Sequence, residues 1–559
     1  MDVLQLGIVM LVLVLLVKPL GNYIYHVFSN HPNKTDKFFG WLERPIYWLT
    51  GLKKRPMMTW KKYALSLLLT NIVLVAVGFV LLTLQGYLFF NPNGIKNMAP
   101  TLAFNTIISF MTNTNLQHYS GETGLSYLSQ MAVIIMMMFT SAATGIAVAI
   151  AFIRGITSRG KVIGNFFEDF TKAITRLLLP MAIVVTIALV ALGVPQTLEP
   201  TVHAHTLEGA GQKIAVGPVA ALESIKHLGT NGGGFFGVNA AHPFENPSPL
   251  SNVIEILSMW CIPAAITYTY GRFAKNQRQG WVILGAMLIL FTAFLSLIYW
   301  SESSGNPALN ALGLNHYEGS MEGKDMRFGL AQSTLFSAVT TAATTGSVNN
   351  MHDTLTPLGG LVPLALMMLN VVFGGDGVGL VNMLMYAILA VFLCGLLVGR
   401  TPEFLGRKIE PKEMKLMTIA LLTHPLIILA PTAISFLTKL GTVAITNPGF
   451  HGISQVLYEF TSSAANNGSG FEGLGDNTPY WNISTGLVML FGRYISIIAL
   501  LAVGGSLVKK PWVPETIGTF KTDSALFTGI LVGTVILIGA LTFLPVLALG
   551  PISEYLTIH

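Results

Sequence analysis

The chain has 559 residues, of which 52% are hydrophobic and 10% are charged, and its mean hydropathy is +0.62. A soluble domain of this length would not tolerate that composition, so the sequence predicts a polytopic membrane protein. The net charge of +6 could suit nucleic acid, but the basic residues lie in loops between apolar runs and form no patch with interleaved aromatics, so we expect no nucleic-acid partner.

Ten apolar runs are long enough to cross a bilayer, which takes about 20 residues. In chain order they cover 3–23, 62–86, 125–153, 173–193, 250–270, 281–300, 377–399, 416–438, 483–508 and 525–549. The first run lacks a basic flank and leads to Lys18-Pro19 rather than to a small-residue cleavage site. We therefore expect it to remain as a membrane helix, and we expect lipid to surround the spans.

Four shorter apolar runs are too short to span a bilayer, and each leads directly into an uncharged polar tetrapeptide. The runs cover 99–111, 217–228, 329–341 and 452–463, which we interpret as re-entrant pore helices. The tetrapeptides are Thr114-Asn115-Leu116-Gln117, Gly229-Thr230-Asn231-Gly232, Ala343-Thr344-Thr345-Gly346 and Ala465-Asn466-Asn467-Gly468. Their last residues are spaced nearly evenly along the chain, which indicates four copies of one pore loop.

The tetrapeptides carry the ligand types that suit a monovalent cation. A K+ ion gives up its water only where a ring of carbonyl and hydroxyl oxygens replaces it, and glycine lets consecutive carbonyls point the same way at positive φ. Rings of Asp or Glu would favour divalent cations, and no carboxylate lies in any of the four. The sequence therefore predicts that all four tetrapeptides form one filter that binds and conducts a monovalent cation such as K+.

The first copy differs from the others, because Gln117 stands where the other three have glycine. A residue with a β-carbon costs about 1 kcal/mol or more in a left-handed conformation. We therefore expect either a different backbone there or a side-chain amide in the pore wall, and we expect Gln117 to set the ion preference.

Two features predict a gate beneath this filter. The apolar stretch from Leu358 to Gly399 exceeds one span and is interrupted by Gly374-Gly375-Asp376-Gly377-Val378-Gly379, and such a break survives at membrane depth only where protein or a watery cavity surrounds it. Arg493 lies within the ninth apolar run, where a cation costs about 2.5–3.5 kcal/mol. It either stands below the filter and stops free conduction, or forms a packed ion pair, with Asp376 as a possible partner.

The charges of the loops predict the orientation. Lys and Arg gather in every second loop, at 34–62, 154–172, 272–278, 400–415 and 509–521, and such loops are cytoplasmic by the positive-inside rule. All four pore loops then enter from outside in the same orientation, as parallel rather than inverted repeats. Three carboxylates that follow the motifs, Glu122, Glu245 and Glu472, either form an acidic outer vestibule or are ordinary surface groups.

The predicted fold is an all-α membrane protein with ten transmembrane helices and four parallel membrane-pore-membrane repeats around one pseudo-fourfold pore. The predicted units are an additional N-terminal helix at 1–30, repeats at 62–153, 173–270, 281–399 and 416–508, and an additional C-terminal helix at 525–549.

Catalytic and nucleotide-binding signals are missing from the sequence. It contains no Asp-Lys-Thr-Gly-Thr phosphorylation motif and no Gly-rich phosphate loop ending in Lys-Ser/Thr. The stretch from Gly232 to Gly237 matches a dinucleotide fingerprint, but no βαβ unit surrounds it. We expect no catalytic residue and no bound nucleotide, so the energy for active transport must come from a partner or an ion gradient.

With these residues, the chain resembles the potassium-binding A subunits of the bacterial Kdp potassium-importing ATPases over nearly its whole length. The resemblance is most specific in Thr112-Asn113-Thr114-Asn115, Tyr119-Ser120-Gly121-Glu122-Thr123, Gly229-Thr230-Asn231-Gly232-Gly233-Gly234-Phe235-Phe236, His242-Pro243-Phe244-Glu245-Asn246-Pro247, Gly399-Arg400-Thr401-Pro402-Glu403 and Ser462-Ser463-Ala464-Ala465-Asn466-Asn467-Gly468.

The resemblance implies the fold of the K+ transporter superfamily and a place in the bacterial cytoplasmic membrane. It also implies that K+ passes from the filter through an intersubunit tunnel to a P-type ATPase subunit, with two small accessory membrane subunits completing the complex. The intramembrane gating loop would fall on Gly374 to Gly379.

Two alternatives remain at this point. The first shares the fold and is a self-sufficient K+ channel or cation symporter of the Trk/Ktr/HKT kind, driven by a gradient. The second is a polytopic membrane enzyme, which would need an acidic pair or a metal-ligand cluster at a membrane face that the sequence does not show.

Overall fold

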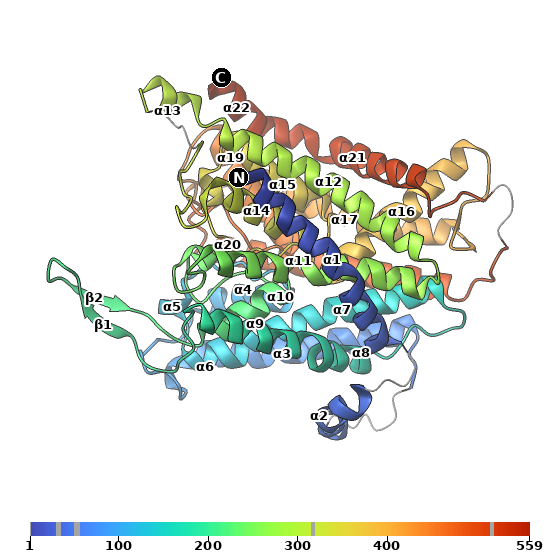
Figure 1. Cartoon of the computed structure of the whole chain (residues 1–559), viewed down its shortest axis with the longest axis horizontal. Helices are drawn as coiled ribbons and strands as arrows, with labels where there is room; N and C mark the ends of the chain where they lie inside the picture. The colour runs from blue at the N-terminus through green and yellow to red at the C-terminus, as the bar shows by residue number, and fades with distance from the viewer. Residues whose placement is uncertain (1, 30–34, 50–55, 315–318, 515–518, 559) are drawn as a thin grey trace.

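Long apolar helices form the body of the protein, because only a helix satisfies its own backbone hydrogen bonds inside a bilayer (Figure 1). The computed structural model describes residues 2–29, 35–49, 56–314, 319–514 and 519–558. Ten helices in these ranges are long and apolar enough to cross a membrane, which confirms the ten predicted spans. They are built on α1 (Asp2–Phe28), α3 (Trp60–Leu84), α7 (Met136–Thr157), α9 (Leu179–Ala191), α11 (Pro249–Phe273), α12 (Gln277–Ser303), α16 (Val378–Leu397), α17 (Pro411–Leu437), α20 (Pro479–Leu507) and α21 (Ala525–Leu547).

Shorter helices extend several of these spans or connect them. The α-helical ones are α2 (Thr35–Leu49), α5 (Gly121–Gly124), α6 (Tyr127–Ser129), α8 (Phe166–Lys172), α13 (Pro307–Ala311), α18 (Lys439–Thr442) and α22 (Ser553–Ile558). The 3-10 helices are η1 (Gln85–Tyr87), η4 (Asn239–Ala241) and η5 (His352–Thr354), and the π-helical segments are η2 (Gln130–Ile135), η3 (Ala173–Leu178) and η6 (Ala548–Ile552). Each π segment lies at a junction inside a span, where it widens one turn.

Four short helices, α4 (Pro100–Met111), α10 (Val219–Leu228), α14 (Gly329–Ala342) and α19 (Phe450–Ala465), lie where pore helices were predicted. Most of their residues are buried, because each helix packs between spans. The contacts pair α4 with α3 and α20, α10 with α9 and α11, α14 with α12 and α15, and α19 with α17 and α20. Each pore helix thus packs against the span that precedes it in the chain, and the predicted repeats and their boundaries stay a prediction.

The third of these units contains the predicted helix break. Helix α15 (Pro357–Leu369) ends at Asn370, which has a φ of +49°, and α16 begins at Val378. Between them the backbone is irregular, with positive φ at Gly374, Gly375 and Gly377, a conformation that glycine adopts without steric cost. The predicted break in the apolar stretch is therefore confirmed, and the stretch forms a short helix, α15, and a helix long enough to span a membrane, α16.

Two small antiparallel hairpins lie at opposite ends of the bundle. One, β1 (Val202–His205) with β2 (Gly211–Ile214), projects from the end that also carries both chain termini (Figure 1). The other, β3 (Glu403–Phe404) with β4 (Arg407–Lys408), connects α16 to α17 at the opposite end.

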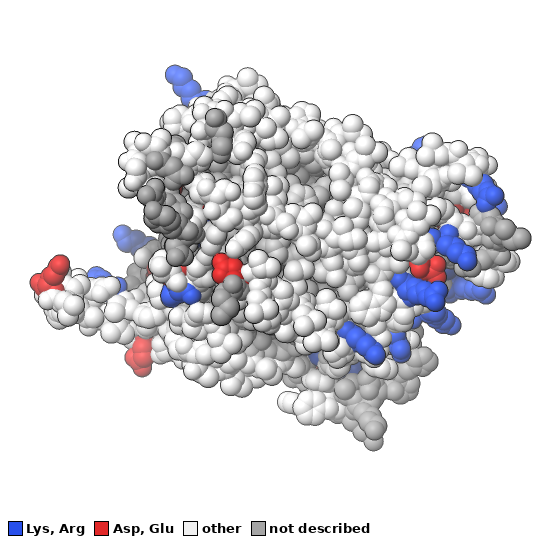
Figure 2. Space-filling model, turned by 45° about the horizontal axis from the view of Figure 1, so that its top comes forward, with Lys and Arg blue, Asp and Glu red and all other residues white. Residues whose placement is uncertain are grey.

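Basic residues gather at the end of the molecule away from the β1–β2 hairpin. Figure 2 shows most of the visible Lys and Arg side chains there, whereas the hairpin end carries several acidic ones. Of the basic loops that the orientation rests on, the positions Lys34, Lys53, Lys54 and Arg55 lie outside the described residues. The arrangement has the asymmetry that the positive-inside rule describes.

Candidate functional site

Four polar segments leave the C-terminal ends of the four pore helices and begin in the same way. In each, one backbone N–H donates to the carbonyl five residues earlier in the pore helix: Thr114 to Ser109 (2.9 Å), Asn231 to Lys226 (2.9 Å), Thr345 to Thr340 (2.7 Å) and Asn467 to Ser462 (2.9 Å). The residue before each donor has positive φ: Asn113 (65°), Thr230 (44°), Thr344 (46°) and Asn466 (56°). These shared features identify equivalent positions without reference to the sequence motif.

The equivalence changes the register of the first segment. Because Thr114 matches Asn231, the residue at the level of Gly232 is Asn115, not Gln117. The N–H group of the next residue supports this register. The Gly346 N–H donates to Thr340 Oγ1 and the Gly468 N–H to Ser462 Oγ. In the first segment the Asn115 N–H likewise returns to the pore helix, where it donates to the Ser109 carbonyl (3.1 Å). The expectation that Gln117 stands at the glycine position is therefore wrong. The first to fourth polar segments are 112–115, 229–232, 343–346 and 465–468.

The four polar segments converge on a common axis. A β-carbon added to Gly232 would lie 2.5 Å from the Thr345 carbonyl oxygen and 3.2 Å from that of Asn467. One added to Gly346 would overlap the Asn467 carbonyl oxygen, and one added to Gly468 would overlap that of Thr114. Backbone oxygens of equivalent residues thus face the same narrow space from different segments, and a side chain at any of these three glycines would overlap them.

Amide side chains connect neighbouring segments and hold them in place. Asn113 Nδ2 donates to the Thr230 carbonyl (2.7 Å), and Asn231 Nδ2 donates to Asn113 Oδ1 (2.8 Å). Asn466 Nδ2 donates to Thr114 Oγ1 (2.9 Å), which joins the fourth segment to the first, and Asn467 Nδ2 donates to the Thr340 carbonyl (2.9 Å). Buried amides with partners of this kind fix a backbone, because an unpaired one costs about 1–3 kcal/mol.

Gln117 lies one level further out and joins the first segment to the chain beyond the second. Its Nε2 donates to the Gly234 carbonyl (3.0 Å) and its Oε1 accepts from the Gly234 N–H (2.9 Å). The side chain also lines the cavity outside the four segments. Its role in ion preference stays a prediction.

The outer cavity has a volume of about 430 Å³ and is lined by carboxylates. Glu122, Glu472 and Asp476 border it. Glu245 does not, because its side chain is 0% exposed and pairs with Lys226 at 2.8 Å, so its predicted place in the vestibule is wrong.

His118 adds a positive charge beside this cavity. It lies 3.1 Å from Glu459 and 3.9 Å from Asp476. Burial by itself would lower the pKa of His118, but the Asp476 and Glu459 carboxylates outweigh burial and raise that pKa to about 9. His118 is therefore a cation at neutral pH, and it anchors the chain just outside the first segment.

The broken-helix loop at 370–377 closes the space beneath the segments. The Gly374 N–H donates to the Ala342 carbonyl (2.8 Å), and the Asp376 N–H donates to Thr230 Oγ1 (2.9 Å). Thr344 Oγ1 would lie 2.6 Å from a β-carbon added to Gly375. The predicted gating glycines thus lie directly under the second and third segments.

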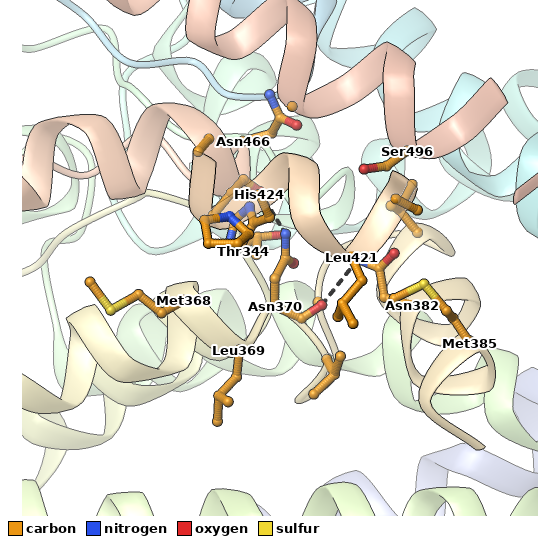
Figure 3. Close-up of a pocket in the computed structure, with 18 of the residues that line it drawn as sticks. Thr344, Met368, Leu369, Asn370, Asn382, Met385, Leu421, His424, Asn466 and Ser496 are labelled. Atoms are coloured by element: carbon orange, nitrogen blue, oxygen red, sulfur yellow. Dashed lines mark hydrogen bonds between the residues drawn. The ribbon is translucent and has the colours of Figure 1, made fainter. Parts of the chain in front are cut away.

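An inner cavity of about 60 Å³ lies beside this loop. Thr344 and Asn466 border it from the segments, Asn370 from the loop, and residues of α16, α17 and α21 from the bundle. Figure 3 shows the Asn370 carbonyl accepting a hydrogen bond from the Asn382 side chain, at 3.1 Å. The cavity therefore extends from the segments toward these three helices.

Arg493 borders the same inner cavity and is not paired with Asp376. Its Nη2 donates to the Ser141 carbonyl (3.2 Å), and in the described part of the chain no ion pair joins it to a carboxylate. Both Asp376 carboxylate oxygens are buried without a hydrogen-bond partner among the described residues. Arg493 and Asp376 therefore interact only at a distance longer than a salt bridge, and a role of Arg493 as a barrier to conduction stays a prediction.

Sequence reasoning missed Thr112 and Asn113 as members of the first segment. The stretch from Thr112 to Asn115 repeats Thr-Asn, so its alignment with the other copies is ambiguous by two residues. The end of the apolar pore-helix run at Met111 was the signal that could have set the register, since the second and third segments begin directly after their helices and the fourth begins at the last residue of its helix.

Comparisons with known proteins identify the family and the fold of the chain. The family described as potassium-transporting ATPase A subunit, KdpA, matches residues 7–556. A potassium-transporting ATPase potassium-binding subunit of Geobacillus kaustophilus is 64% identical over 555 residues, which cover 99% of each chain. The crystal structure of the potassium transporter TrkH from Vibrio parahaemolyticus superposes with a TM-score of 0.53 at 15% identity, over 80% of this chain and 86% of that one, and so shares its fold.

Proposed function

Since the chain belongs to the potassium-transporting ATPase A subunit family, whose members are the potassium-binding subunits of potassium-transporting ATPases, we propose that its four polar segments form the K+ filter. In this proposal K+ enters from outside the bacterial cytoplasmic membrane, loses its water in the filter, and leaves sideways below it to a P-type ATPase subunit. Two small accessory membrane subunits complete the complex.

One observation carries the proposal: equivalent backbone carbonyls of the polar segments face one narrow space that a single methyl group would fill. Uncharged carbonyl oxygens replace the hydration shell of K+ without the charge that would favour a divalent ion. The four pore helices add to this, because their C-terminal ends precede the segments and a helix C-terminus carries a partial negative charge. A dehydrated monovalent cation is the ligand that these groups fit.

The loop beneath the filter and Arg493 supply the means to stop free conduction. The Asp376 N–H is bonded to Thr230 of the filter, so movement of the loop and of the second segment are linked. The Arg493 guanidinium at the inner cavity repels a cation that leaves the filter. The ion then waits until the partner subunit draws it through the inner cavity.

The test is a K+-stimulated ATPase assay on the purified complex, with and without this chain. We expect K+ to stimulate ATP hydrolysis only when the chain is present, and Na+ to fail at the same concentration. Stimulation by K+ in the absence of the chain would contradict the proposal.

The likeness to TrkH supports one alternative, in which the chain conducts K+ without a motor. Reconstitution of the chain alone in liposomes separates the two. Our proposal expects no uptake of Rb+ or K+ into such liposomes beyond protein-free vesicles, whereas a self-sufficient channel would fill them down the gradient.

A further inference from the structure

A buried ion pair lies behind the second polar segment and has no part in the function proposed above. Lys226 Nζ lies 2.6 Å from Glu223 Oε2 and 2.8 Å from Glu245 Oε2, and all three side chains are 0% exposed. Burying charged groups costs several kcal/mol per ion. The cost is offset only where the geometry is close and further hydrogen bonds satisfy the remaining polar atoms.

The pair connects the two ends of the second segment. Before the segment, the Lys226 carbonyl accepts the Asn231 N–H (2.9 Å). After it, Glu245 Oε1 accepts the Phe236 N–H (2.7 Å), while Glu245 Oε2 binds the Lys226 ammonium. The Lys226–Glu245 bridge therefore closes a loop around the segment and sets the distance between its two ends.

The next residue along the pore helix extends this support to the third segment. The His227 carbonyl accepts the Thr230 N–H (3.2 Å), and His227 Nε2 is 3.0 Å from Ser347 Oγ, directly after Gly346. The second and third segments are thus held at the same level from behind.

The charges of the cluster also suit a nearby cation. An ammonium two residues from the end of a pore helix would oppose K+ in the filter if it stood alone. Glu223 and Glu245 contact it, and Glu255 lies close to His227, so the cluster as a whole does not present a free positive charge. Removing a carboxylate leaves that ammonium less compensated.

We propose that Lys226 and Glu245 are positioning residues of the K+ filter. Their bridge fixes the spacing of the second segment and thereby the fit of its carbonyls to K+ rather than to Rb+ or Na+. The inference rests on the proposed function, since it assigns a role to residues behind the filter.

The test compares Glu245→Gln and Lys226→Met in the intact complex, by K+- and Rb+-dependent ATPase activity. We expect the half-saturating K+ concentration to rise about tenfold, with the maximal rate within about twofold and a reduced preference for K+ over Rb+. Lys226→Arg keeps the charge and should restore part of the affinity. Wild-type affinity and preference in both Glu245→Gln and Lys226→Met would overturn the inference.

A matched control is the buried pair of Lys324 and Glu302, which are 2.7 Å apart and 0% exposed. Lys324→Met should lower the melting temperature but leave the preference for K+ over Rb+ unchanged. An equal loss of preference in Lys324→Met would show a general effect of destabilisation and would also overturn the inference.

Two further variants keep the outcome decisive. Gly232→Ala tests the proposed filter directly. If this variant changes K+ affinity and the Lys226 variants do not, the inference about Lys226 and Glu245 is wrong and the proposed filter is retained. If neither kind of variant changes K+ affinity, the proposed filter itself is wrong. Should Glu245→Gln not fold, Ser347→Ala removes only the hydroxyl that His227 contacts, and it must then show the same reduced preference for K+.

Discussion

Single atoms decide whether the proposed filter can hold an ion. Gly346 and Gly468 have φ values of +86° and +108°, and a β-carbon at either would overlap a carbonyl oxygen of the adjacent segment. Their side-chain hydrogen therefore serves two purposes: it permits the backbone conformation and it leaves the ion space open.

Gly468→Ala should raise the half-saturating K+ concentration about tenfold or more. Overpacking costs about 1–3 kcal/mol, and here the methyl group meets the Thr114 carbonyl, an expected ion ligand. K+-dependent ATPase activity of the complex measures the change. Gly533→Ala is the control, because among the described residues nothing lies within 4 Å of a β-carbon at that glycine. Unaltered affinity in Gly468→Ala would remove the fourth segment from the filter.

Arg493→Met should let K+ leak without ATP. The Arg493 guanidinium borders the inner cavity beside the filter and bonds a backbone carbonyl rather than a carboxylate. Its positive charge therefore repels a cation in the inner cavity. The measurement is Rb+ uptake into liposomes that contain the complex, in the absence of nucleotide. Tight vesicles with normal ATP-driven transport would show that Arg493 does not block the path.

At the scale of elements, the pore helices and the broken helix have different structural roles. The pore helices bring the segments together, and the 370–377 loop closes them from below because α15 and α16 stop short of each other. At the outer end, His451 links α19 to α22: it contacts Asp353 and Glu554, each at 2.9 Å.

Raising the pH should loosen α22. Burial by itself would lower the pKa of His451, but its hydrogen bonds to Asp353 and Glu554 outweigh burial and raise that pKa from 6.5 to about 9. Because the folded pKa exceeds the unfolded one, the stabilisation is complete below pH 6.5 and is lost as the pH rises through about 9.

The measurement for α22 is the mobility of a probe on Thr557→Cys, followed from pH 6 to pH 10. His451→Gln cannot carry the charge, so it should show a mobile α22 at every pH. A probe that reports the same mobility across the range in the wild-type protein would refute the role of His451.

At the scale of the whole molecule, the basic end and the hairpin end predict opposite sides of the membrane. In a background without Cys261 and Cys394, a membrane-impermeant maleimide added to intact cells should label Gln212→Cys on β2 and not Lys509→Cys after α20. Both positions are exposed in the structure. Labelling of Lys509→Cys alone would invert the proposed direction of transport.

The sequence by itself determined the elements. The thickness of a bilayer separates the ten long apolar runs from the four short ones, and Gly374 to Gly377 cannot continue a helix at low cost, so the spans, the pore helices and the break at 370–377 all followed from local composition. The likeness of the four tetrapeptides then indicated that they act together.

Only the tertiary structure decided the partners of the polar residues. The structure places Asn115, and not Gln117, at the level of Gly232 in the first segment. It pairs Glu245 with Lys226 instead of exposing it in the outer cavity, and it bonds Arg493 to the Ser141 carbonyl instead of to Asp376. The physical reason is that hydropathy acts on a segment as a whole, whereas a buried polar atom takes the partner that another helix end brings within about 3 Å, and that helix comes from a distant part of the chain.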